Sequence, residues 1–442
     1  MRRAVRFASS VVFVLGVGGA VLAGLHAGRQ TAAPPAEQTV AHAPALRWIP
    51  STDALIADLQ ARIARGPANA QAYAMLGSAY LQKARASGDP AYYSKADRVL
   101  AEAVALDPAN ADVFVALGTL ALARHRFEDG LRYGERAREL NPYKAAALGV
   151  IADAQVELGR YEEAVRTVQA MVDLRPDLAS FARVSYIREL HGDLPGAVEA
   201  MQRAANAGAP GSESLAWTRV QLGHLYFSAG NLAAAEREYE RTLAELPGYV
   251  HARAGLARVQ AARADYAGAI ALYDELARGV PLPEYVIALA DVHRAAGNAD
   301  EAARAEELVQ VMDRLYRENG VDTDAEMALF AADRGLDLPG TLDRARRLVA
   351  ARPSIQSYDV LAWALYQVGA DEEAMAAAEE ALRLGTRDSL LRYHAGMIAA
   401  RLGDRDRAHT LLREALDQNP FFSLRHGGEA RRTLEQVSQT PE

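Results

Sequence analysis

The sequence predicts an all-α solenoid made of about ten copies of one small helical unit. Four of the six intervals between recurring prolines are 34 residues; these prolines are residues 67, 108, 142, 176, 210, 247 and 281. A fixed period of this length is the sequence signature of a repeat architecture. No segment shows the sustained apolar–polar alternation that a half-buried strand requires. The period and the lack of strand patterns together predict the fold class.

Residues 1–27 have the composition of a membrane-targeting segment. Three arginines within residues 1–6 precede an uncharged run of 19 residues, Phe7 to Leu25. As a helix this run would be about 28 Å long, against a hydrocarbon core of about 30 Å. We expect either a cleaved signal peptide or a single transmembrane anchor. The basic start predicts that the rest of the chain lies outside the cytoplasm, in the periplasm.

Two features accompany this segment. Gly16, Ala20 and Gly24 share one helix face, and such a small-residue face allows two membrane helices to pack closely. A homo-oligomer formed in this way is therefore one possibility. Residues 28–50 are rich in alanine and proline, which predicts a tether between the membrane segment and the folded part.

The N-terminal array is expected over residues 51–320. Leu55, Leu59 and Ile63 recur every four residues on one helical face, and this lone helix is expected to cap the array. About seven repeats follow. The first interval between prolines is seven residues longer than 34, and we assign the surplus to an extended hairpin loop over residues 83–93.

A second array of about three repeats is expected over residues 321–421. Its first repeat, residues 321–353, departs most from the pattern, and a break near residues 319–324 separates the two arrays. No proline ends the preceding helix, which we expect to continue to Asn319-Gly320. Residues 422–442 end in polar residues and are expected to form a tail with a short capping helix.

The spacing and residue types resemble those of the tetratricopeptide repeat (TPR) family over about residues 52–421. One clear copy reads Leu222-Gly223, Tyr226, Gly230, Ala235, Tyr239 and Pro247, and the next has Leu256, Ala269, Tyr273 and Pro281. The resemblance implies a right-handed superhelical solenoid whose first helices line a concave surface. It also implies that each unit packs only on its neighbours.

Small residues are needed where the two helices of a unit cross, because a larger side chain would hold their axes apart. We assign this structural role to Gly77, Gly118, Ala164, Gly223, Ala235, Ala269, Ala374, Gly396 and Ala408. Substitution at these positions is expected to damage folding rather than recognition.

The resemblance also implies which positions of the first helices face the groove. The predicted partner-binding residues are Trp217, His224, Phe227, Arg258, Asp359, Trp363, Tyr366, Tyr393 and Arg401. They form two aromatic clusters, and rigid aromatics beside charged groups suit a peptide or a partner helix. The alternative is that these aromatics pack against the next repeat or a capping helix.

Composition excludes several classes of function. The net charge of −8 becomes −11 when the three positive charges of residues 1–6 are set aside, and an acidic body argues against nucleic acid. Cysteine is absent, which excludes disulfides and thiolate metal sites. No zinc-protease histidine pair, phosphate-binding loop or nucleophile elbow is present. We therefore expect no catalytic residue, no metal and no cofactor, and we expect His394 to be a surface or packing residue.

These features predict a non-catalytic interaction scaffold, held at or exported across the cytoplasmic membrane. It would bind protein or peptide partners of an envelope-associated assembly in its concave groove. The alternative is an extracytoplasmic module that binds a glycan or small molecule on the aromatic groove residues. The mixed charges of the predicted groove favour a peptide or protein.

Overall fold

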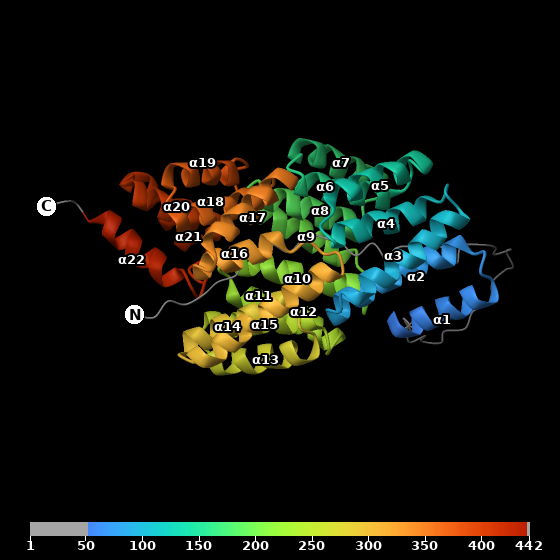
Figure 1. Ribbon diagram of the computed structural model, residues 1–442, viewed down its shortest axis with the longest axis horizontal. Helices are drawn as coiled ribbons and strands as arrows, with labels where there is room; N and C mark the ends of the chain where they lie inside the picture. Colours follow the sequence, from blue (N-terminus) through green and yellow to red (C-terminus); the bar gives the residue numbers. More distant parts are fainter. Residues whose placement is uncertain (1–51, 440–442) are drawn as a thin grey trace, which may run out of the picture.

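A computed structural model of the chain describes residues 52–439, and this part is helical throughout (Figure 1). The helices of the first half are α1 (Thr52–Arg65), α2 (Ala70–Ser87), α3 (Ala91–Leu106), α4 (Ala111–Ala123), α5 (Phe127–Leu140), α6 (Ala145–Glu157), α7 (Tyr161–Leu174), α8 (Leu178–Leu190), α9 (Leu194–Asn206), α10 (Glu213–Ser228) and α11 (Leu232–Glu245). Those of the second half are α12 (Val250–Ala262), α13 (Tyr266–Gly279), α14 (Pro283–Ala296), α15 (Ala299–Glu318), α16 (Asp324–Arg334), α17 (Leu338–Ala351), α18 (Ile355–Val368), α19 (Asp371–Leu382), α20 (Ser389–Leu402), α21 (Arg405–Gln418) and α22 (Gly427–Ser438).

The helices pair into ten antiparallel hairpins, from α2–α3 to α20–α21, with α1 and α22 left over at the two ends of the described chain. Residues 52–439 contain no strand. The predicted all-α solenoid of about ten repeats is therefore confirmed. The expected anchor (1–27), the tether (28–50) and the last three residues lie outside the described residues. No helix within residues 52–439 is both long and apolar enough to cross a membrane.

Two local expectations about repeat length have different outcomes. The surplus of the first repeat does not form a long loop, because α2 has 18 residues and α3 has 16, and only residues 88–90 separate them. Gly88 ends α2 with a φ of 65°, a conformation that favours glycine. The expectation that the second helix of the seventh repeat continues to Asn319 is met, since α15 is 20 residues long and Asn319 is its C-cap.

Small residues lie at the crossing points inside the hairpins, as expected. A Cβ atom added to Gly77 would come within 2.6 Å of the Leu100 side chain, and one added to Gly223 within 2.4 Å of Tyr239. A Cβ on Gly396 would come within 2.8 Å of Leu412. One on Gly118 would come within 2.6 Å of Val150 in the next repeat. The five predicted alanines are completely buried: Ala164, Ala235, Ala269, Ala374 and Ala408.

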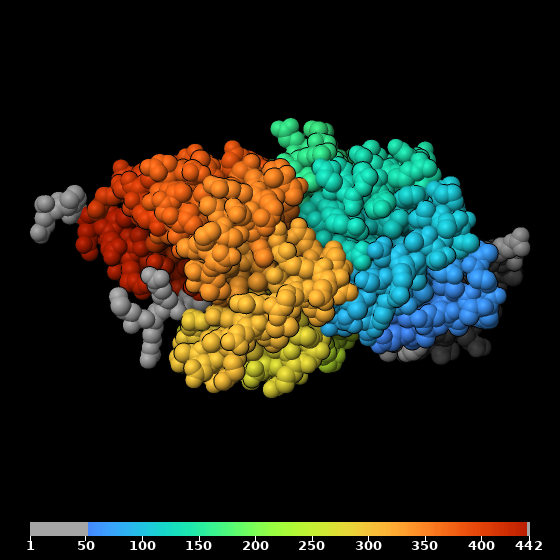
Figure 2. Space-filling model, viewed as in Figure 1, coloured from blue at the N-terminus to red at the C-terminus, as the bar shows by residue number. Residues whose placement is uncertain are grey.

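The superhelix is wound tightly enough that successive turns touch. Hydrogen bonds join residues 194, 195 and 197 positions apart in the sequence, a separation of between five and six repeats of 34 residues. Figure 2 shows the surface of residues near 300–330 meeting that of residues near 80–110. At this junction the Tyr316 hydroxyl donates to the Gly88 carbonyl at 3.1 Å.

Contacts between the turns repeat along the molecule. The hairpin bend at Gly159 lies against the Pro353 carbonyl, the bend at Gly192 against the Gly385 carbonyl, and the bend at Gly230 against the Gln418 carbonyl. An added Cβ would lie 2.4, 2.4 and 3.0 Å from these oxygens, respectively. Each bend of the first turn therefore meets the end of a hairpin or the loop after it in the second turn.

Buried side chains reinforce these backbone contacts. The Tyr161 hydroxyl accepts a hydrogen bond from the Ile355 amide at 2.7 Å, and the Arg352 guanidinium forms a buried ion pair with Glu157. Val156, Tyr161 and Leu190 belong to the same hydrophobic cluster as residues of α16–α18 and α20. The expectation that each unit packs only on its neighbours is therefore wrong, because the tight winding brings distant repeats into contact.

Candidate binding chamber

The concave surface encloses a central cavity of about 400 Å³. Its wall comes from both turns of the superhelix, namely from α2, α10, α12 and α14 and from α15, α16, α18 and the loop before α22. We call this cavity the chamber. A second cavity of about 160 Å³ adjoins it and shares six wall residues with it: Gln221, His224, Arg258, Leu329, Val360 and Phe422.

The first predicted cluster lies on the chamber wall. Trp217 is half-buried, and Phe227 is buried beneath the guanidinium of Arg258, whose central carbon lies 3.8 Å from the ring centre. His224 lies 2.8 Å from the Tyr239 hydroxyl through its Nδ1. The structure therefore brings together four residues from α10 and α12 that the sequence placed in the groove.

Two arginines in the chamber have no carboxylate partner. Neither Arg85 nor Arg258 forms an ion pair with any residue of the described chain. Burial lowers the pKa of the Arg258 guanidinium from its ordinary value. An arginine nevertheless stays charged in proteins, so a desolvated cation without a direct ion-pair partner faces the chamber, with Asp388 acting on it from the adjoining cavity.

Two histidines on the wall are held neutral. Desolvation lowers the pKa of His224 to about 3, with a further contribution from Arg258. Desolvation likewise lowers the pKa of His251 to about 4, assisted by Arg85. His251 lies 2.6 Å from the Tyr285 hydroxyl, so this imidazole serves as a hydrogen-bonding group rather than as a cation at neutral pH.

Acidic residues outnumber the two arginines on the chamber wall, which also holds Glu213, Glu284, Asp291, Asp313 and Glu326. Glu284 lines the chamber and keeps accessible surface, but the protein packed around it raises its pKa to about 7. In the adjoining cavity, burial and the nearby Asp388 raise the pKa of Glu189 to about 7. The chamber can therefore receive a ligand of mixed charge, with a preference for an anion beside Arg258.

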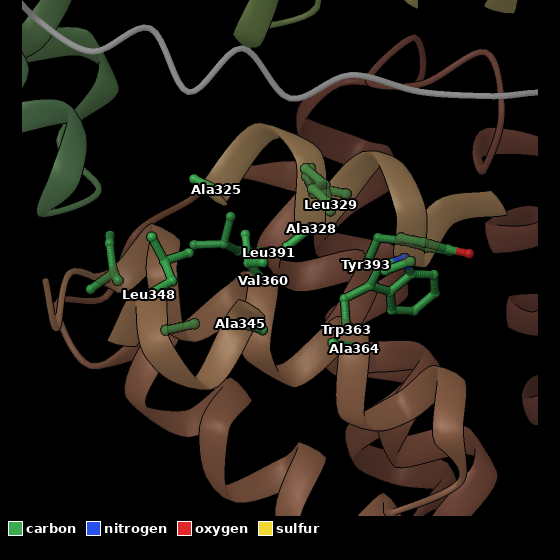
Figure 3. Packing of buried hydrophobic residues seen from close by; sticks show 14 of the residues in the cluster. Ala325, Ala328, Leu329, Ala345, Leu348, Val360, Trp363, Ala364, Leu391 and Tyr393 are labelled. Carbon is green, nitrogen blue, oxygen red and sulfur yellow. The ribbon is translucent and has the colours of Figure 1, made fainter. Parts of the chain in front are cut away.

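The second predicted cluster is not an open groove. Trp363 and Tyr393 are 2% and 0% exposed, and Figure 3 shows them side by side among the helices of the second turn. Tyr366 stacks on Trp363 with ring centres 4.8 Å apart, and Arg401 covers the outer face of Tyr366 while pairing with Asp371. The packing alternative holds here, because the rings fill the space between α18 and α20.

Asp359 has a different place from the one expected. It is 4% exposed, borders the adjoining cavity and accepts a hydrogen bond from Nδ1 of His394 at 2.8 Å. The same region holds Asp333 and His426, which sequence reasoning did not single out. They are distant in the sequence and carry no local motif, so only the fold reveals their proximity.

Several further residues of the chamber wall were not predicted from the sequence, namely Arg85, Tyr93, Tyr316 and residues 421–424. They reach the chamber because the second turn of the superhelix lies against the first. No repeat position signals such a contact.

Comparison with known proteins agrees with the repeat pattern. The family model of the tetratricopeptide repeat matches residues 121–185 and 226–292, within α4–α8 and α10–α14. These two segments match the tetratricopeptide repeat. No curated protein matches it.

Three solved structures are similar to the chain. A thermophilic TPR protein of Thermus thermophilus has 19% identity over 42% of this chain and 99% of its own, with a TM-score of 0.37. The Cut9–Hcn1 hetero-tetramer of the APC/C has 15% identity over 88% of this chain and 84% of its own, with a TM-score of 0.41. YrrB, a TPR protein with an unusual peptide-binding site, has 15% identity over 44% and 95%, with a TM-score of 0.27. Scores this low permit no residue-by-residue comparison.

Proposed function

We propose that this protein is a non-catalytic scaffold that takes a short acidic segment of a protein partner into the chamber. The fold supports protein binding in general, because stacked helical repeats present extended concave surfaces. The observation that carries the finer proposal is the Arg258 guanidinium, desolvated in the chamber, stacked on Phe227 and without an ion-pair partner in the described chain.

A carboxylate of the partner would satisfy this arginine. A desolvated cation without a counter-charge lowers stability, whereas a planar guanidinium holds a carboxylate through two parallel hydrogen bonds. Trp217 supplies rigid apolar area beside it, as the anchor pockets of binding sites do, and Phe227 supports the guanidinium from beneath. The volume of about 400 Å³ lies within the usual range for ligand pockets and accommodates a few side chains rather than a helix.

Peptide selection tests the proposal. A random-peptide display library is selected on the full chain and counter-selected on Arg258→Gln. We expect enrichment of peptides with an acidic residue beside apolar ones, and at least tenfold weaker binding to Arg258→Gln, because removing one partner of a buried charge pair costs about 2 to 5 kcal/mol.

The matched control is Arg253→Gln, which removes an arginine of the same helix that pairs with Glu275. This variant should bind the selected peptides like the wild type. Enrichment that survives in Arg258→Gln would disprove the assigned role. A glycan array that gives specific, Arg258-dependent binding would support the ligand-binding alternative instead.

The location of the scaffold rests on the sequence alone. The basic residues 1–6 and the uncharged run after them support the proposal that the chain is anchored in, or exported across, the cytoplasmic membrane and serves an envelope-associated assembly. Cell fractionation with protease protection tests this proposal. Recovery of the intact chain in the cytosolic fraction would contradict it.

A further inference from the structure

Three buried side chains converge in the second turn of the superhelix, outside the chamber. Asp333 lies in the last turn of α16, His394 in α20, and His426 immediately before α22. One potential ligand atom of each lies within 4.8 Å of those of the other two, and all three residues are buried. Two imidazoles and one carboxylate form a donor set that borderline divalent cations such as Zn²⁺ prefer.

An unsatisfied nitrogen distinguishes this cluster from ordinary packing. His394 is 1% exposed, and its Nε2 has no hydrogen-bond partner in the described chain. Its Nδ1 is engaged by Asp359, so Nε2 is the atom that faces the cluster. Buried polar atoms in folded proteins are nearly always paired, so this one requires an explanation.

The surroundings of His394 match those of a metal-bound histidine. Such a histidine usually donates its second ring nitrogen to a carboxylate, which fixes the tautomer and orients the ring. Asp359 takes this position for His394 at 2.8 Å. For His426, Nδ1 lies 3.2 Å from the Tyr393 hydroxyl and 3.9 Å from the Glu429 carboxylate, which leaves Nε2 directed at Asp333.

The rings are also held in place. His394 stacks on Trp363 with ring centres 4.1 Å apart, and His426 meets the same indole edge-on at 5.5 Å. The indole nitrogen of Trp363 donates to Asp333 at 2.9 Å. His426 Nε2 and Asp333 Oδ1 lie 3.0 Å apart, close to the separation of about 3.4 Å that two ligands of a tetrahedral ion with bonds of about 2.0 to 2.2 Å would have.

We propose that Asp333, His394 and His426 form a binding site for a divalent transition-metal ion of the Zn²⁺ type, with Asp359 and Glu429 as outer carboxylates. The ion joins α16, α20 and the start of α22. Because residues 421–424 line the chamber and only Arg425 separates them from His426, the ion also fixes that part of the chamber wall.

Metal titration of the full chain, prepared without a histidine tag and stripped with a chelator, tests the site. We expect one Zn²⁺ to bind per chain, with an increase in melting temperature of about 3 °C or more at saturating ion. Co²⁺ should give the visible absorption bands of a low-symmetry site with nitrogen and oxygen ligands.

Variants separate ligands from orienting residues. His394→Gln and His426→Gln should each abolish the Co²⁺ bands. Asp359→Asn should keep them and weaken Zn²⁺ binding by about 10- to 100-fold, the usual effect of removing an outer partner. His191→Gln, which removes an exposed histidine, is the control and should bind like the wild type.

Metal titration of the wild type tests the proposed site even if the ligand variants fail to fold. If the stripped chain gives no Co²⁺ bands and no saturable Zn²⁺ binding, the proposal is overturned. Binding that His191→Gln abolishes, and that folded His394→Gln retains, would also overturn it by placing the ion at the surface.

Discussion

Arg258 and Phe227 lie in contact on the chamber wall, and the guanidinium forms no direct ion pair within the described chain, although Asp388 acts on it at longer range. The same missing ion-pair partner that lowers the stability of the free protein also leaves the guanidinium available to bind a ligand. A cation kept ready for a partner lowers the stability of the free protein, as is common at functional sites.

We expect Arg258→Met to raise the free energy of unfolding by about 1 kcal/mol while it abolishes peptide binding. Removing the unpaired buried charge outweighs the loss of the cation–π contact, since apolar replacements of buried charges are often stabilising. Chemical denaturation measures the difference, and Arg253→Met, at a more accessible position, should change stability by less than about 0.5 kcal/mol. A destabilised Arg258→Met would show that the arginine serves packing.

The pH dependence of stability tests the neutral state of His251. Its pKa is about 4 in the folded chain, against an ordinary value of 6.5, so below pH 6.5 the unfolded chain takes up a proton that the folded chain refuses. Its contribution to stability is therefore present above pH 6.5 and is lost as pH falls toward 4. Between pH 7.5 and pH 5, this titration lowers the free energy of unfolding by on the order of 1 to 2 kcal/mol. The His251→Gln variant should lack this decrease.

The comparison must be made between variant and wild type, because Glu284 acts in the opposite direction. Its folded pKa of about 7 means that its contribution is present below pH 4.5 and is lost as pH rises through 7. Denaturation at several pH values gives the free energy of unfolding against pH for the wild type and for His251→Gln. Parallel curves for wild type and His251→Gln would show that the imidazole titrates normally.

At the scale of elements, the hairpin bends do more than reverse the chain. Gly159, Gly192 and Gly230 have φ values of 69°, 77° and 73°, and each also lies against a carbonyl of the other superhelical turn. Glycine is needed twice at such a bend, once for the backbone conformation and once for the close approach. Bends at the edge of the structure need it only for the conformation.

Gly192→Ala and Gly403→Ala separate the two requirements. Both positions have left-handed φ values, 77° and 83°, but an added Cβ would lie 2.4 Å from the Gly385 carbonyl in the first case and would meet nothing within 4 Å in the second. Gly403→Ala should cost about 1 kcal/mol, and Gly192→Ala about 1 to 3 kcal/mol more. Thermal denaturation measures both, and equal losses would contradict the contact between the turns.

At the scale of the whole molecule, contacts between turns change how the solenoid unfolds. An extended repeat array gains stability from neighbouring units only. Here the Arg352–Glu157 pair, the Tyr161–Ile355 hydrogen bond and a shared hydrophobic cluster join distant repeats. The chamber wall comes from the same two turns, so the stability of the chain and its binding surface both depend on how the turns lie against each other.

Calorimetry of Arg352→Ala tests this coupling. We expect the wild type to unfold in one cooperative transition and the variant to be destabilised by about 3 to 5 kcal/mol, because Glu157 is left buried without its partner. Arg160→Ala, which breaks the exposed pair with Glu128, is the control and should lose less than about 1 kcal/mol. Two separate transitions in the wild type would mean that the turns unfold independently.

The sequence by itself determined the repeat unit. Proline spacing and the small residues at Gly77, Gly223 and Gly396 predict helical hairpins, because these constraints act between residues a few turns of helix apart. It also placed Trp217, His224, Phe227 and Arg258 on the concave side, since each repeat position faces a fixed direction.

Only the tertiary structure decided what that side faces. The chamber, whose wall comes from both turns, follows from the pitch of the superhelix, whereas the burial of Trp363 and Tyr393 and the meeting of Asp333 with His394 and His426 follow from packing between nearby repeats of the second turn. The pitch sums small rotations over many repeats, and no single repeat encodes it. No pattern in the sequence therefore predicts which residues one superhelical turn apart will lie in contact.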